Sequence, residues 1–153
     1  MNTLAETYTS QNWKPTSPGS ETYSSNEVID AYLKGKEEGI KQKGKLILNK
    51  LKENAERTTG ATGKVFNFLH KKKFNPIAAY LRLNSWDSLD ILITIPEKEF
   101  ISEKLLTVYS FVSRLENELE TDFYNITFSF ADEEDDFDRE HLVSDGFVLR
   151  YSS

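Results

Sequence analysis

The spacing of apolar positions along the chain changes at Pro76. Before it, apolar residues recur at helical intervals over residues 28–55 and again over residues 61–73. Gly60 lies between these two segments and Gly63 lies near the start of the second, and together they predict a break, because glycine costs about 1 kcal/mol relative to alanine inside a helix. The first half of the chain is therefore expected to hold two helices.

After Pro76 the pattern alternates, which is typical of strands with one buried face. Residues 77–83 and 89–95 are joined by a short polar turn and predict a hairpin. Two further alternating segments cover residues 124–132 and 146–151.

The strongest helical signal lies between the hairpin and the third strand, over residues 97–120. Its apolar positions are spaced by three and four residues and form one continuous stripe: Ile101, Leu105, Val108, Val112, Leu115 and Leu119. We expect this stripe to pack on the sheet, with Phe100, Leu106, Tyr109 and Phe111 widening its buried face. The predicted fold is an α+β domain in which a small antiparallel four-stranded sheet, ordered β-β-α-β-α-β, packs on one long helix and is preceded by a helical N-terminal arm.

This pattern divides the chain into three parts. Residues 1–25 contain ten Ser or Thr residues and only one large aliphatic residue, and are expected to be disordered. Residues 26–59 form the basic helical arm, and residues 60–153 form the α+β domain. Three aromatic residues of the first part are candidate anchors for a partner protein, or else pack on the domain itself: Tyr8, Trp13 and Tyr23.

The charges are distributed unevenly along the chain. Residues 34–73 contain 12 basic and 4 acidic residues, whereas residues 97–145 contain 4 basic and 15 acidic residues. Lysines of the basic part are candidates for binding nucleic acid phosphates: Lys41, Lys43, Lys45, Lys71, Lys72 and Lys73. The sequence pI near 5.0 and the acidic second half oppose this interpretation, because they repel a phosphate backbone.

The densest acidic segment follows the third predicted strand. Its carboxylates are candidates for contact with a protein partner: Asp132, Glu133, Glu134, Asp135 and Asp136. The segment does not fit a calcium-binding loop, because Phe137 and Val143 stand where such a loop needs glycine and glutamate. A solvated acidic loop remains the simplest interpretation.

Asp87 and Asp90 lie at the start of the second predicted strand, in the sequence WDSLDILITIP. The order helix, hairpin, acidic strand, long helix and strand over about residues 61–131 resembles the minimal nucleotidyltransferase family. This resemblance implies that Asp90 would be a metal-binding carboxylate. The chain departs from that family where LNSW, residues 83–86, replaces its Gly-Ser pair, and no second carboxylate stands two positions from Asp90. We therefore expect both aspartates to be structural.

No catalytic constellation is complete in this sequence. The chain has no cysteine, which excludes thiol nucleophiles and disulfides, and its two histidines lack the spacing of metal ligands. The segment GATGKV lacks the first glycine and the final Ser or Thr of a phosphate-binding loop. The first residues carry no signal-peptide pattern, which favours the cytoplasm. We expect a non-catalytic protein-interaction or adaptor domain without a cofactor or metal; the alternatives are nucleic-acid binding and a divergent nucleotidyltransferase-like enzyme.

Overall fold

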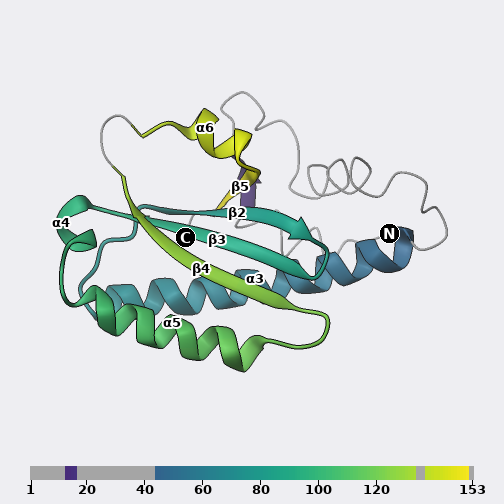
Figure 1. Ribbon diagram of the computed structural model, residues 1–153, viewed down its shortest axis with the longest axis horizontal. Coiled ribbons are helices and arrows are strands. Elements are labelled where there is room, and N and C mark those ends of the chain that lie inside the picture. The colour runs from purple at the N-terminus through teal and green to yellow at the C-terminus, as the bar shows by residue number, and fades with distance from the viewer. Residues whose placement is uncertain (1–12, 17–43, 134–136, 152–153) are drawn as a thin grey trace.

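A computed structural model describes residues 13–16, 44–133 and 137–151 of the chain. These residues form a five-stranded sheet with helices α3 and α5 on one face and the short helix α6 on the other (Figure 1). The elements are β1 (Trp13–Pro15), α3 (Gly44–Lys71), β2 (Ala78–Ser85), β3 (Ser88–Ile95), α4 (Glu97–Phe100), α5 (Leu105–Leu119), β4 (Asn125–Asp132), α6 (Arg139–Ser144) and β5 (Phe147–Tyr151). The α+β class predicted from the sequence is confirmed.

The sheet is mixed and has one strand more than expected. Its strand order is β1-β5-β2-β3-β4. The β2–β3, β2–β5 and β1–β5 pairs are antiparallel, but β3 and β4 are parallel. The prediction of four antiparallel strands is therefore wrong in two respects. Helix α5 carries the chain back across the sheet, which makes β4 parallel to β3, and β1 comes from a segment too short to read as a strand.

Helix α3 continues from Gly44 to Lys71 without the break expected at Gly60 and Gly63. The proposed boundary between arm and domain at residue 60 therefore lies inside this helix. Its buried face is long enough to offset the cost of two glycines: Leu51, Ala55, Ala61, Val65, Phe66 and Leu69 are all buried. At Gly63 a Cβ atom would lie 3.7 Å from the Tyr151 hydroxyl, an ordinary contact, so this glycine is not required by space.

Alternation along the strands separates two apolar clusters, one on each face of the sheet. The main core lies between the sheet and helices α3 and α5 and includes Leu81, Ile93 and Phe128. The smaller cluster lies under α6 and contains Ala78, Tyr80, Leu142 and Phe147. The inward and outward sets of β2, β3 and β4 agree with the sequence pattern.

Phe147 is the exception to that pattern, since we expected it on the same face as Leu149 and Tyr151. The register between β2 and β5 shifts after Leu81, so that Phe147 pairs with Arg82 and packs in the smaller cluster. Such an irregularity adds one residue to a strand and moves the following side chain to the other face.

The long helix predicted over residues 97–120 is two helices. The first, α4, follows Pro96 and ends at Phe100, and the side chain of the next residue, Ile101, is 77% exposed. The second, α5, buries Leu105, Val108, Val112 and Leu115 of the predicted stripe and half-buries Leu119. The prediction of a continuous buried stripe is thus confirmed within α5 and wrong at Ile101.

A buried polar seam fixes α3 to the β2–β3 turn and to the segment just before β4, which meet beside it. The Asn54 side-chain amide donates to the carbonyl oxygens of Trp86 and Phe123, each at 2.9 Å. One turn later, the hydroxyls of Thr58 and Tyr124 are 2.8 Å apart. These bonds satisfy carbonyls at the β2–β3 turn and before β4, and they set the angle at which α3 crosses the sheet.

Candidate functional site

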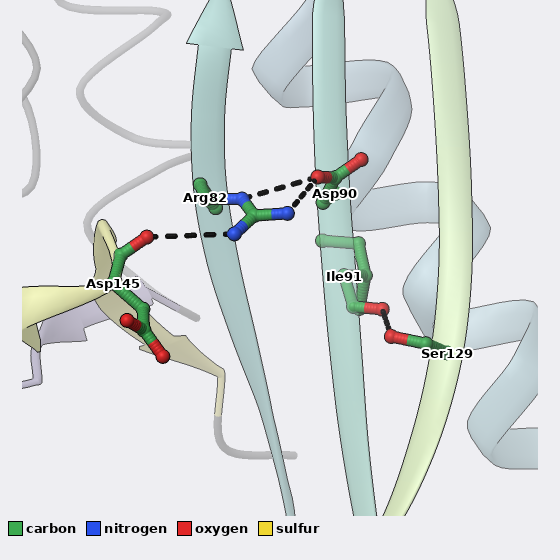
Figure 2. Close-up of polar contacts among 5 residues, drawn as sticks. All are labelled: Arg82, Asp90, Ile91, Ser129 and Asp145. Carbon is green, nitrogen blue, oxygen red and sulfur yellow. Dashed lines mark hydrogen bonds and ion pairs between the residues drawn. The ribbon is translucent and has the colours of Figure 1, made fainter. Parts of the chain in front are cut away.

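The two aspartates that raised the question of catalysis are both engaged by neighbouring side chains. Asp87 lies in the β2–β3 turn and accepts a hydrogen bond from the Ser85 hydroxyl at 2.6 Å. Asp90 lies on β3 opposite Arg82 of β2 and accepts from its Nη2 at 2.6 Å and its Nε at 3.1 Å (Figure 2). Arg82 therefore gives the Asp90 carboxylate an ion-pair partner within the sheet.

Arg82 is held from three sides on the face of the sheet covered in part by α6. Besides its bonds to Asp90, its guanidinium donates to the Asp145 carbonyl oxygen at 3.5 Å (Figure 2). It also lies 4.7 Å from the centre of the Phe147 ring. Gly146 has a φ of 99°, and a Cβ there would lie 3.2 Å from the Arg82 side chain. The turn before β5 therefore requires glycine for both its conformation and its closeness to Arg82.

We expect the Arg82–Asp90 pair to contribute modestly to stability and nothing to metal binding. The two side chains are 37% and 20% exposed, so a double-mutant cycle of Arg82→Ala and Asp90→Ala should give a coupling energy of about 1 kcal/mol in urea unfolding. Magnesium with a nucleoside triphosphate should leave the unfolding midpoint unchanged. A midpoint raised in the wild type but not in the Asp87→Asn, Asp90→Asn double variant would restore the nucleotidyltransferase interpretation.

The predicted acidic patch is only partly described. Asp132 ends β4 and Glu133 follows it, both with half-buried side chains, whereas Glu134, Asp135 and Asp136 lie outside the described residues. Within the part of the chain that the structure describes, no three His, Cys, Asp or Glu side chains are placed to hold a metal ion.

The basic residues proposed to bind nucleic acid do not form one surface in the described part of the chain. Lys71, Lys72 and Lys73 are exposed at and just beyond the end of α3. Lys45 lies in the first turn of the same helix, about 26 residues or 39 Å away along its axis. Lys41 and Lys43 lie outside the described residues. The ring of Tyr80 on the face under α6 is fully buried beside Phe137 and cannot stack on a nucleic acid base.

Trp13 is not an exposed anchor for a partner. It lies in β1 with only 1% of its surface exposed, and the expectation of disorder over residues 1–25 is therefore wrong for residues 13–16. The alternative that it packs on its own domain is the one the structure bears out. Tyr8 and Tyr23 lie outside the described residues.

The structure reveals a different candidate site, the outer edge of β4. This strand ends the sheet, and in the described part of the chain it has a neighbouring strand on one side only. The amides of Asn125 and Glu133 donate toward β3, at 2.7 Å and 3.0 Å, so those of Ile126, Phe128 and Phe130 point outward. An edge of this kind offers backbone donors and acceptors to another strand.

Helix α5 runs beside this edge in the opposite direction (Figure 1). Tyr109 packs edge-on against Phe130, with ring centres 5.4 Å apart. Further along the helix, the Glu116 carboxylate accepts the Phe128 amide at 2.6 Å, and Glu120 accepts from the Asn125 side chain at 3.2 Å. With Leu106 and Ser113, these residues form one stripe along the helix; we call β4 and this stripe the β4 margin.

The β4 margin combines exposed apolar groups with carboxylates. Leu106 is 68% exposed and Tyr109 is 42% exposed at one end, and Phe123 is 57% exposed just before the strand begins. Between them lie Glu116 and Glu120, and neither β4 nor the stripe contains a lysine or arginine. Sequence reasoning missed this site because it assigned Leu106 and Tyr109 to a wide buried face and had no means of identifying β4 as an edge.

The chain has no significant match among protein-family models, curated proteins or solved structures. Among the helices described, none has the length and apolar character needed to cross a membrane. The function of this chain is therefore inferred from the geometry of the β4 margin.

Proposed function

We propose that this protein is a non-catalytic interaction domain that binds an extended segment of a partner protein along the β4 margin. The observation that carries the proposal is the edge of β4 itself, with outward-pointing amides bordered by exposed apolar and acidic side chains of α5. In strand addition, main-chain hydrogen bonds provide affinity and side-chain contacts beside the edge provide specificity.

Glu116 has two roles in this proposal. In the free protein, its carboxylate accepts a hydrogen bond from the Phe128 amide at 2.6 Å. This bond satisfies one of the outward-pointing amides along the edge of β4. A charged side chain that covers an edge also discourages unwanted strand pairing. When the partner binds, one of the partner's backbone carbonyl oxygens accepts the hydrogen bond from the Phe128 amide. A lysine or arginine of the partner then pairs with the released Glu116 carboxylate.

The partner is expected to carry lysine or arginine between apolar residues. Glu116 and Glu120 lie in the middle of the margin and Asp132 ends the strand, while Leu106 and Phe123 mark its apolar ends. Complementary charge accelerates association and selects against partners of the same sign. A second copy of this chain would present the same carboxylates, so the charge pattern favours a different, basic partner.

The proposal predicts selective binding of basic extended peptides. A labelled nine-residue peptide of alternating lysine and valine should bind the full chain in fluorescence anisotropy, and its glutamate–valine counterpart should not. Binding should weaken as salt screens the charges. Hydrogen exchange at the amides of Ile126 and Phe130 should slow, because these donors gain partners at the edge.

Two substitutions localise the binding to the margin. Glu120→Gln should weaken binding by about 1.4- to 5-fold, the equivalent of a surface ion pair. Glu118→Gln removes the same charge from the same helix and is the matched control, because position 118 is offset by about 200° from position 116 around the helix. Equal effects of the two substitutions, or unchanged exchange at Ile126 and Phe130, would show that the peptide binds elsewhere by charge alone.

A further inference from the structure

The opposite margin of the sheet is closed by a strand from the N-terminal region. Trp13, Lys14 and Pro15 pair antiparallel with Tyr151, Arg150 and Leu149 of β5. The Trp13 indole is 1% exposed, its Nε1 donates to the Thr59 hydroxyl at 2.7 Å, and its ring centre lies 5.2 Å from that of Tyr151. The anchor of β1 is thus one aromatic side chain with a satisfied polar group.

The socket for Trp13 is built entirely by the rest of the domain. Thr59 and Phe66 come from α3, and Tyr151 comes from β5. The Thr59 hydroxyl is held by the Ala55 carbonyl at 2.9 Å, and the rings of Phe66 and Tyr151 are 5.1 Å apart in an edge-on contact. These contacts do not involve β1, so the socket has its own support.

Strand β1 is attached to this socket by few bonds. It contributes three ladder positions, and after it the Thr16 amide donates to the Val148 carbonyl at 2.9 Å. Between Thr16 and Gly44 stand 27 residues, which can reach about 90 Å when extended. A short edge strand on so long a connection belongs to the parts of a fold that open locally at low cost.

We propose that the socket of Thr59, Phe66 and Tyr151, together with the edge of β5 on which β1 lies, is a strand-binding site that also accepts β1 of a second copy of this chain. The occupant is defined by β1 itself, since a second copy carries the same tryptophan, the same ladder-forming backbone and the same terminal proline. Every contact made within one chain is available between two chains. This site lies at the other margin of the sheet from the β4 margin and does not depend on it.

The exchange is controlled by effective concentration. A strand that belongs to the same chain competes at an effective concentration, which is of the order of millimolar for linked segments. In the wild type, the chain's own β1 therefore fills the socket, and exchange between copies is the minor state at micromolar concentration. Substitution of Trp13 in one chain should leave the socket of that chain empty, so that the socket can accept β1 of another chain.

Complementation between two full-length variants tests this proposal. Trp13→Ala has an intact socket without an anchor, and Thr59→Lys has an intact β1 but an obstructed socket. Each alone should sediment as a monomer, and an equimolar mixture should form a heterodimer in analytical ultracentrifugation. A mixture that sediments as the sum of its two components, with both variants folded by circular dichroism, would overturn the proposal.

A peptide version keeps the test decisive if either variant fails to fold. Trp13→Phe retains an aromatic ring in the socket but loses the bond to Thr59 and part of the buried indole surface. A labelled peptide copying residues 9–18 should bind Trp13→Phe at least about tenfold more tightly than the wild type, because the wild-type strand competes better within its own chain. A peptide with alanine at the tryptophan position should not bind. Equal binding of the peptide to Trp13→Phe and to the wild type would show that the socket is not an exchangeable site.

Discussion

Replacing Leu105 by alanine is expected to lower the free energy of unfolding by about 2–5 kcal/mol. Leu105 is 4% exposed at the start of α5 and belongs to the main core between the helices and the sheet. Truncation removes buried methyl groups and leaves a cavity that neighbouring side chains fill only in part. Urea unfolding followed by far-ultraviolet circular dichroism measures the loss directly.

The adjacent residue provides a matched control. Leu106 is the same residue type in the same helix, but its side chain is 68% exposed, so Leu106→Ala should change the free energy of unfolding by less than about 0.5 kcal/mol. The same substitution should weaken binding of the basic peptide, because Leu106 belongs to the β4 margin. Equal stability losses at positions 105 and 106 would show that α5 does not face the sheet as described.

The alternation of side chains along the strands could be predicted because it follows from local geometry. Ile93 and Phe128 were assigned to the core from spacing alone, and both are buried. The α5 stripe was assigned in the same way, and it fails only at Ile101, where the chain leaves α4 and the helical period no longer applies. The spacing of apolar residues shows which side chains share a face wherever the helix or strand is regular.

The strand order could not be predicted, since it depends on contacts between distant segments. Nothing local distinguishes a parallel β4 from an antiparallel one; the direction is set by α5 crossing the sheet. In the same way, Trp13 lies in a segment of polar composition that reads as disordered, and its burial is decided by a bond to Thr59, 46 residues away. Continuity of α3 through Gly60 and Gly63 likewise depends on its packing against the sheet.

The candidate site shows the same contrast between local patterns, which can be read from the sequence, and contacts between distant segments, which cannot. The absence of a Gly-Ser pair and of a second carboxylate two positions from Asp90 can be read directly from the sequence, whereas the ion pair of Asp90 with Arg82 depends on how β2 pairs with β3. The sequence did not indicate the β4 margin, because an edge is a property of strand order. Glu116 would have been one surface carboxylate among many without its bond to the Phe128 amide.

Raising the pH above 10 is expected to destabilise the fold through Tyr124. Its side chain is fully buried beside α3, and burial raises the pKa of this phenol to about 12, although the Thr58 hydroxyl and the Arg57 cation oppose the shift. The pKa of an unfolded tyrosine is about 10. The folded state thus holds the phenol proton more tightly than the unfolded state.

The sign of the effect follows from proton linkage. Below about pH 10, tyrosine is neutral in both states and the full stability is present. Between about pH 10 and pH 12 only the unfolded chain releases the proton, so stability falls by about 2–3 kcal/mol in total. Burial also raises the pKa of Tyr151, which adds to the fall in the same direction.

Tyr124→Phe isolates this contribution. At neutral pH the variant loses the bond between the Tyr124 and Thr58 hydroxyls, a cost of about 0.5–1.5 kcal/mol, while Thr58 keeps its bond to the Asn54 carbonyl at 2.7 Å. Urea unfolding of both proteins at intervals between pH 8 and pH 12 should give stability curves that converge and then cross, because the wild type loses about 2–3 kcal/mol and starts only about 0.5–1.5 kcal/mol higher. Lysine and arginine titrate in both proteins and cancel in the difference. Parallel curves would mean that the Tyr124 phenol ionises as readily in the folded chain as in the unfolded one. The buried seam of Asn54, Thr58 and Tyr124 would then not hold α3 in the way the structure describes.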